Sequence, residues 1–206
     1  MPVWTIVVAG GSGARFGERK QYLTLGGRRV LDWALEAARA RSDGVVLVVP
    51  DDAASEAEPS ADVVVAGGET RSGSVRCGLA AVPVEADVIV VHDAARPVPA
   101  PAVWERVLKA VESGADAAVP AVPLTDTVRE VGGTTVDREG LVAVQTPQAF
   151  KAALLRAAHA ACPEGTDDAS LVEAAGGSVV VVDGEASNIK ITTPVDLMLA
   201  EVLCRR

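Results

Sequence analysis

The chain has 206 residues, 49% of them hydrophobic, and a formal net charge of −9 at pH 7. This length suits one large domain with a sizeable core, so we expect residues 1–206 to form a single domain. The negative charge argues against nucleic acid as a partner, and with neither a signal peptide nor about 18 consecutive apolar residues we expect a cytoplasmic protein without a membrane segment.

Apolar runs alternate with helical patterns along most of the chain. Continuous Val and Ile runs predict strands buried on both faces, and strand–helix alternation predicts an α/β fold with a mainly parallel sheet and right-handed crossovers. Any ligand crevice then lies beyond the carboxyl ends of the strands. The predicted strands are 3–9, 44–50, 62–68, 86–93, 115–123 and 177–184; the predicted helices are 30–40, 71–82, 101–113, 150–162 and one from Pro194, with Thr193 as its N-cap.

Residues 125–147, "TDTVREVGGTTVDREGLVAVQTP", do not follow this alternation. Strand-like flanks on either side of Gly132-Gly133 predict a β-hairpin with a two-residue loop. A two-stranded hairpin is marginal by itself in water, so this arm, about 125–145, is expected to pack on something else.

The first strand ends in a glycine-rich turn, "AGGSGARFG", followed by "KQYL". A P-loop would need a Lys followed by Ser or Thr, and a dinucleotide fingerprint would need glycine where Phe16 stands. A third possibility is a loop whose backbone N–H groups approach a triphosphate, with Arg15 and Lys20 delivering positive charge. A turn that only closes a strand–helix connection is the structural alternative.

Nine short motifs then carry a resemblance to a known family. They are "AGGSGAR", "KQYL", "GGETRSGSV", "VHDAARP", "DTV", "VDR", "TPQAF", "TDDAS" and "NIKIT". In this order, over nearly the whole chain, they resemble the 2-C-methyl-D-erythritol 4-phosphate cytidylyltransferase family. The resemblance implies a Rossmann-like nucleotidyltransferase fold with a mixed, mainly parallel sheet and a protruding hairpin arm through which two copies form a homodimer. It also implies transfer of the cytidylyl group of CTP to methylerythritol phosphate with Mg²⁺, giving 4-diphosphocytidyl-2-C-methylerythritol and pyrophosphate.

The same resemblance assigns roles to individual residues, with Gly68, Glu69 and Ser74 recognising cytosine. The catalytic set is Arg15, Lys20, Arg138 and Lys190. The nucleotide-binding set is Ala9, Gly10, Gly11, Ser12, Gly13, Gly68, Glu69, Ser74, Asp93 and Ala95. The substrate-binding set is Arg96, Thr127, Arg138, Thr146, Thr166 and Lys190, and the Mg²⁺ ligand is Asp93. Two positions depart from the family pattern: Gly10 replaces an alanine, and Arg19 replaces a proline and adds charge near the triphosphate.

The implied chemistry explains why the sequence offers no base-like constellation. The nucleophile is the substrate's own phosphate, which is already mostly dianionic at neutral pH because its second pKa is near 6. We therefore expect His92 to be structural and His159 to be a surface or packing residue. Asp167 and Asp168 are expected to cap the helix that follows them. Three widely spaced cysteines without metal-ligand spacing are expected to be reduced thiols: Cys77, Cys162 and Cys204.

Three other functions share part of this pattern. Ribitol-5-phosphate cytidylyltransferases have the loop and several later motifs, although "KQY", "VDR" and "NIKIT" favour the methylerythritol phosphate enzymes. Guanylyltransferases of the molybdenum-cofactor type also have a glycine–arginine loop but lack the later motifs. A regulatory module that binds a nucleotide without turnover would be expected to lack Arg15, Lys20 or Asp93, and all three are present.

Overall fold

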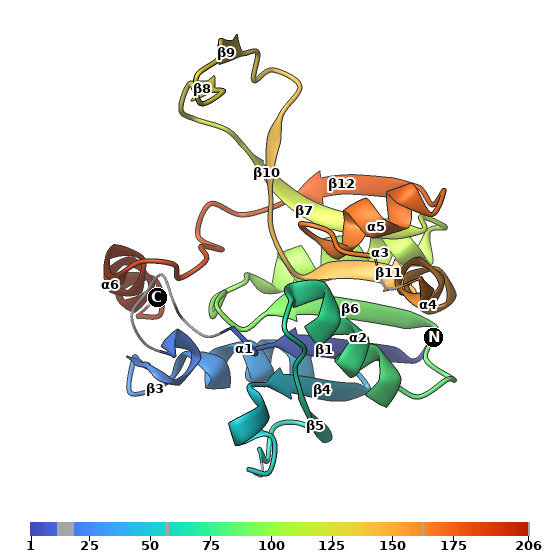
Figure 1. The fold of residues 1–206 in the computed structure, drawn as a ribbon. Coiled ribbons are helices and arrows are strands. Elements are labelled where there is room, and N and C mark those ends of the chain that lie inside the picture. The colour runs from blue at the N-terminus through green and yellow to red at the C-terminus, as the bar shows by residue number, and fades with distance from the viewer. Residues whose placement is uncertain (12–18, 57, 162, 206) are drawn as a thin grey trace.

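The computed structural model describes every residue of the chain except 12–18, 57, 162 and 206. Its described residues form an eight-stranded sheet in the order β10-β7-β11-β6-β1-β4-β5, with β12 beside β7 (Figure 1). The strands are β1 (Val3–Val8), β4 (Gly44–Val49), β5 (Val63–Ala66), β6 (Val88–Asp93), β7 (Ala117–Pro123), β10 (Val142–Val144), β11 (Gln148–Lys151) and β12 (Val179–Asp183). The α-helices are α1 (Val30–Arg39), α2 (Arg71–Ala81), α3 (Pro101–Glu112), α4 (Ala152–Ala160), α5 (Asp168–Ala174) and α6 (Pro194–Leu203).

The sheet is mainly parallel, which confirms the prediction. β1 lies between β4 and β6 and is parallel to both, with Val8 opposite Val48 on one side and opposite Asp93 on the other. β11 and β10 are the antiparallel exceptions. The parallel strands β1, β5 and β6 therefore all end at one edge of the sheet, where glycines follow β1 and β5 and where Asp93 is the last residue of β6.

The predicted helix 150–162 begins too early. Residues 148–151 form strand β11, inserted between β6 and β7, and the helix starts at Ala152. Phe150 is fully buried in this strand. Four residues are too few for a periodic pattern, so the helical signal of the alanine-rich segment extended over them.

Helices cover both faces of the sheet. On one face α2, α4 and α5 pack over a cluster that includes Ile6 and Phe150. On the other, α1 and α3 pack over a cluster that includes Leu35 and Trp104. Each such large apolar side chain is fully or almost fully buried, and burial of this kind stabilises the fold by about 1.5–3 kcal/mol per side chain.

The last helix positions the segment before it. Thr193 accepts a hydrogen bond from Asp196 N, Thr193 N donates to the Asp196 carboxylate, and Pro194 is the first helical residue, as predicted. A small apolar cluster joins α6 to the hairpin of β2 (Thr24–Leu25) and β3 (Arg28–Arg29) and contains Ile191. Ile191 N also donates to Ala95 O at 2.8 Å, which fixes residue 190 beside the end of β6.

The arm projects away from the sheet (Figure 1). Its tip is a two-stranded hairpin of β8 (Val128–Arg129) and β9 (Thr135–Val136). The predicted two-residue loop is wrong: residues 130–134 connect the strands, Gly133 N donates to Glu130 O, and Gly132 has a positive φ of 77°. β10 then returns the chain to the main sheet. Within the described residues, no helix is both long enough and apolar enough to cross a bilayer.

Candidate active site

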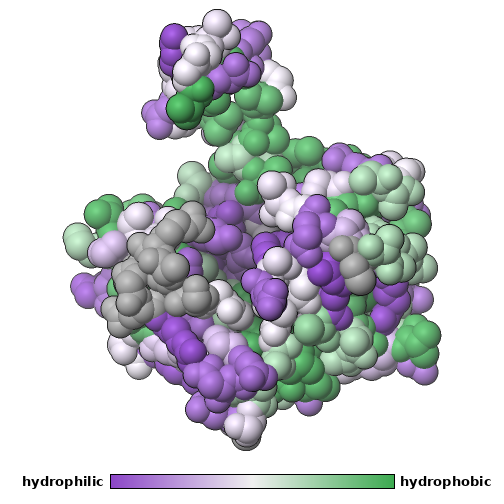
Figure 2. Space-filling view, viewed as in Figure 1, coloured by the Kyte–Doolittle hydropathy of each residue, from purple (hydrophilic) through white to green (hydrophobic). Residues whose placement is uncertain are grey.

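Two cavities open at the edge where β1, β5 and β6 end. The glycine cavity, about 400 Å³, is lined by the turn after β1, the turn after β5 and the start of α2. The threonine cavity, about 510 Å³, lies between β7, β10, β12 and the start of α5 and contains Thr146 and Thr166. Figure 2 shows a hollow on this face, below the arm, where hydrophilic residues gather.

Close backbone contacts shape the glycine cavity. A Cβ at Gly68 would lie 2.9 Å from the backbone carbon of Gly73, and a Cβ at Gly10 would lie 3.3 Å from Ser74 Oγ. Ser74 Oγ in turn donates to Gly68 O at 3.3 Å. Gln21 Nε2 donates to Ala9 O at 2.8 Å and ties residue 21 to the end of β1. A side chain at Gly68 would displace this wall of the cavity.

Arg71, Asp93 and Lys190 line both cavities, and we call this trio the junction. Lys190 Nζ lies 2.6 Å from Asp93 Oδ2, and Arg71 Nε lies 3.5 Å from Asp93 Oδ1. Burial by itself would raise the pKa of Asp93, but the positive charges of Lys190, Arg71 and Arg96 lower that pKa far below its ordinary value. Asp93 is therefore a carboxylate at neutral pH, with a cation at each of its oxygens.

A chain of hydrogen bonds orients Asp93. Its backbone N–H donates to Thr146 Oγ1 at 3.1 Å, and Thr146 Oγ1 lies 3.1 Å from His92 Nδ1. Because Nε2 of the neutral His92 ring must carry the proton to bond a carbonyl, Nδ1 accepts and the Thr146 hydroxyl donates to it. His92 Nε2–H then donates to Arg96 O at 3.0 Å. Burial lowers the pKa of His92 to about 4, so the ring is neutral at pH 7. His92 is a structural residue, as the sequence predicted.

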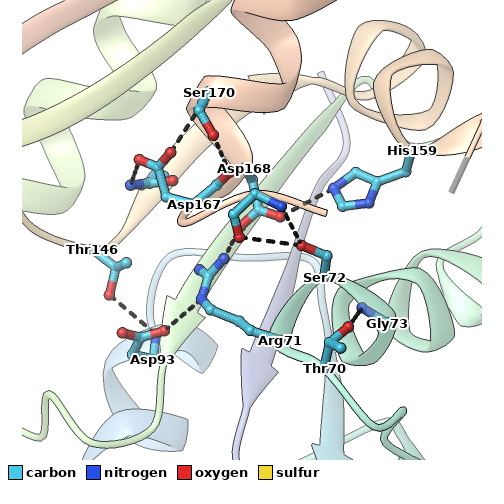
Figure 3. Close-up of polar contacts among 12 residues, drawn as sticks. Thr70, Arg71, Ser72, Gly73, Asp93, Thr146, His159, Asp167, Asp168 and Ser170 are labelled. Atoms are coloured by element: carbon cyan, nitrogen blue, oxygen red, sulfur yellow. Dashed lines mark hydrogen bonds and ion pairs between the residues drawn. The ribbon is translucent and has the colours of Figure 1, made fainter. Parts of the chain in front are cut away.

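Arg71 is the junction residue that sequence reasoning missed. Its NH1 donates to Asp168 Oδ2 at 2.8 Å, and Asp168, fully buried, also contacts His159 Nε2 at 3.0 Å (Figure 3). Burial tends to lower the pKa of Arg71, but the negative charges of Asp168 and Asp93 raise it overall. The available signal was its place in "GGETRSGSV", as the first residue of a helix and between the predicted cytosine-binding residues Glu69 and Ser74.

The capping prediction for the two aspartates is half right. Asp167 caps α5 and accepts from Ser170 N at 3.0 Å. Asp168 is not a cap, because its carboxylate faces Arg71 and His159 instead. His159 is a buried packing residue between α4 and α5.

Most of the residues singled out from the sequence lie at the two cavities. Those that line the glycine cavity are Ala9, Gly10, Gly11, Lys20, Gly68, Glu69, Ser74, Asp93, Ala95 and Lys190. Those that line the threonine cavity are Asp93, Arg96, Thr146, Thr166 and Lys190. Ser12, Gly13 and Arg15 lie outside the described residues.

Three residues are placed elsewhere. Thr127 and Arg138 lie on the exposed arm, where Arg138 NH1 donates to Thr125 O, and neither lines a cavity of its own chain. Arg19, expected near the triphosphate, instead forms a surface ion pair with Asp52, NH2 to Oδ2 at 2.9 Å. The proline-to-arginine departure thus places its charge at the surface rather than in either cavity.

The Asp93 carboxylate suits a hard cation that also takes oxygen ligands from a bound phosphate. Among the described residues, no group of three or more His, Cys, Asp or Glu side chains could hold a metal ion without other ligands. Asp93 does present one ionised carboxylate to both cavities. Mg²⁺ is commonly held by one or two carboxylates together with substrate phosphates, so this arrangement fits Mg²⁺.

Residues 3–206 match the model of the family described as IspD, 2-C-methyl-D-erythritol 4-phosphate cytidylyltransferase. The chain belongs to this family. A cytidylyltransferase of that name from Nocardia farcinica is 44% identical over 99% of this chain and 94% of its own length. A second, from Rhodococcus jostii, is 43% identical over 98% and 95%. The crystal structure of the cytidylyltransferase from Thermus thermophilus is 40% identical, covers 100% of both chains and superposes with a TM-score of 0.88. The fold is therefore the Rossmann-like nucleotidyltransferase fold of this cytidylyltransferase family.

Proposed function

We propose that the chain transfers the cytidylyl group of CTP to 2-C-methyl-D-erythritol 4-phosphate, in the synthesis of isoprenoid precursors. The observation that carries this proposal is the meeting of two cavities at the junction of Arg71, Asp93 and Lys190. CTP occupies the glycine cavity and methylerythritol phosphate the threonine cavity, so the two phosphate groups meet where the positive side chains converge. Full-length membership of the family supports the choice of substrates.

The reaction forms one bond and breaks one. A phosphate oxygen of methylerythritol phosphate attacks the α-phosphorus of CTP, and the bond from that phosphorus to the bridging oxygen breaks. Pyrophosphate leaves with the electron pair, and the product is 4-diphosphocytidyl-2-C-methylerythritol. The attacking phosphate is a dianion at neutral pH, so no side chain needs to remove a proton. The neutral, fully hydrogen-bonded ring of His92 is consistent with this absence of a base.

The barrier is the repulsion between two polyanions, and the chain's cations oppose it. Lys20 lies in the glycine cavity, and Lys190 and Arg71 lie where the cavities meet. Positive groups fixed beside the phosphate that accumulates charge can each lower the barrier by several kcal/mol. We assign the same role to Arg15. Its guanidinium can bind two phosphate oxygens at once, whereas Lys20 acts as a point charge.

We propose that Asp93 holds Mg²⁺ together with the phosphates of CTP. The ion supplies charge neutralisation and orientation of the triphosphate. Asp93 would hold the ion through the carboxylate that Lys190 contacts at 2.6 Å in this structure. Lys190 lines both cavities and can also contact the phosphate of methylerythritol phosphate.

We further propose that the protein is a cytoplasmic homodimer, with one domain per chain, and that the arm of each subunit completes the other's site. Thr127 and Arg138 lie on the arm and line neither cavity of their own chain. A partner's Arg138 would bring another cation to the substrate phosphate. Cys77 and Cys204 are free thiols, which suits a reducing compartment.

The test measures pyrophosphate release from CTP and Mg²⁺ with each of two acceptors, methylerythritol phosphate and ribitol 5-phosphate. We expect turnover with methylerythritol phosphate only. Turnover with ribitol phosphate alone would identify the other cytidylyltransferase, and tight CTP binding without turnover with either acceptor would favour a regulatory module. GTP in place of CTP tests the guanylyltransferase alternative.

A further inference from the structure

Asp168 has surroundings that neither packing nor capping accounts for. Its side chain is fully buried, yet it carries a carboxylate contacted by Arg71 on one oxygen and by His159 on the other. A buried ion pair is a poor source of stability, since apolar side chains of similar volume often serve as well or better. The position at which Asp168 holds Arg71 is the more informative feature.

The Arg71 guanidinium lies between two carboxylates and binds them unequally. NH1 is 2.8 Å from Asp168 Oδ2, whereas Nε is 3.5 Å from Asp93 Oδ1 (Figure 3). Arginine prefers short, paired contacts with a single carboxylate. Asp168 therefore keeps the guanidinium from closing on Asp93. Without it, Arg71 would join Lys190 in neutralising Asp93, and its guanidinium would be less available to a phosphate.

We propose that Asp168 is a positioning residue of the transfer reaction, which fixes the Arg71 guanidinium at the junction so that it meets the reacting phosphates. The inference rests on the proposed function. It assigns Arg71 to direct contact with phosphate and Asp168 to an action through Arg71. The His159 bond, on the other Asp168 oxygen, joins α4 to α5 and has a structural role only.

A double-mutant cycle tests the proposal. Its members are the wild type, Asp168→Asn, Arg71→Gln and the double variant, with His159→Gln as the matched control that removes the other contact of Asp168. A small misplacement of a catalytic group costs up to about a hundredfold in rate. We expect Asp168→Asn to lower kcat by roughly 10–100-fold, and His159→Gln by less than about threefold. In the Arg71→Gln background, Asp168→Asn should lower kcat by less than about twofold more.

A purely structural Asp168 predicts a different pattern. Asp168→Asn would then lower kcat by the same factor whether residue 71 is Arg or Gln, or would do no more than His159→Gln, and either result overturns the proposal. If Asp168→Asn fails to fold, Arg71→Lys replaces it. A single ammonium cannot contact Asp168 and Asp93 through two separate nitrogens. A folded Arg71→Lys protein with unchanged kcat also overturns the proposal, and a tenfold loss supports it.

Failure of the proposed function would be recognised separately. If the wild type makes no product from CTP and methylerythritol phosphate, the same proteins are compared by calorimetric binding of CTP. A weaker CTP affinity in Asp168→Asn that disappears in the Arg71→Gln background supports the positioning of Arg71. An equal change in both backgrounds, or no change in either, overturns it.

Discussion

Replacement of Lys190 by methionine separates the electrostatics of the junction from the stability of the fold. The Lys190 ammonium lies 2.6 Å from Asp93 Oδ2. Coulomb's law with an effective dielectric constant of about 20 gives about 6 kcal/mol for unit charges at that distance, before the cost of desolvation. The Lys190 side chain is 36% exposed, so water screens the pair, and Arg71 still faces Asp93. A net loss of about 1–2 kcal/mol in the free energy of unfolding is expected.

The expected loss of activity is larger than the loss of stability. Removing one fixed positive group that faces the negative charge developing in the transition state lowers kcat by about 10²–10³-fold. Because small proteins are stable by about 5–15 kcal/mol, Lys190→Met should remain folded at 25 °C and the kinetic loss should not reflect unfolding. Pyrophosphate release gives kcat, and urea denaturation gives the free energy of unfolding.

Lys151→Met is the matched control. Lys151 Nζ lies 2.9 Å from Asp116 Oδ1, in an ion pair with side chains 41% and 28% exposed, and neither residue lines the glycine cavity or the threonine cavity. We expect a stability loss of no more than about 1 kcal/mol and an unchanged kcat. A folded Lys190→Met protein with kcat within about threefold of the wild type would refute the role of Lys190, and so would an equal kinetic loss in the control.

Three further outcomes are expected. Mixing inactive Lys20→Ala and Arg138→Ala chains should restore about a quarter of normal activity. Random pairing makes about half the dimers mixed, and each mixed dimer has one intact site out of two. No rescue despite verified mixed dimers would place Arg138 in its own subunit's site or outside both sites. Asp93→Asn should need a higher Mg²⁺ concentration for half-maximal turnover, and an unchanged requirement would remove Asp93 as a metal ligand. The pKa of His92 is about 4 in the folded chain and about 6.5 when unfolded, so acidification protonates only the unfolded state over this range and lowers stability by up to about 3 kcal/mol. Urea denaturation between about pH 7 and pH 4.5 should show a shallower pH dependence in His92→Gln, and identical slopes would contradict the assignment.

The strands and helices with strong local patterns could be predicted from the sequence. Val-rich runs indicated the parallel strands, and Thr193 with Pro194 marked the start of α6. β11 could not be predicted, because its four residues form a strand only by pairing with β6 and β7, both distant in sequence. The hairpin loop was predicted too short for a related reason. Glycine identifies a turn, but the bond from Gly133 N to Glu130 O decides its length.

In the candidate site too, some residues could be predicted from the sequence and others only from the folded structure. Lys20 and Asp93 could be named from the sequence, because the family resemblance assigns a role to each of them, and both lie at the cavities. Arg71 and Asp168 are 97 residues apart, and neither has a pattern that distinguishes a buried partner from a helix-surface charge. Their relation exists only after α2 and α5 pack on the same face of the sheet. A sequence thus indicates which residues contact a ligand more readily than it indicates which other residues hold those side chains in position.

The overall charge of the chain makes the position of its cations significant. A formal net charge of −9 disfavours association with large polyanions such as nucleic acids. Positive side chains nevertheless gather at the junction, where Lys190 and Arg71 flank Asp93, and Lys20 lies in the adjoining cavity. Screening in physiological salt confines exposed charges to about 8 Å, so a small phosphate ligand inside the cavities experiences mainly the local cations. A small phosphate ligand in these cavities therefore meets locally gathered cations, even though the formal charge of the whole chain is negative.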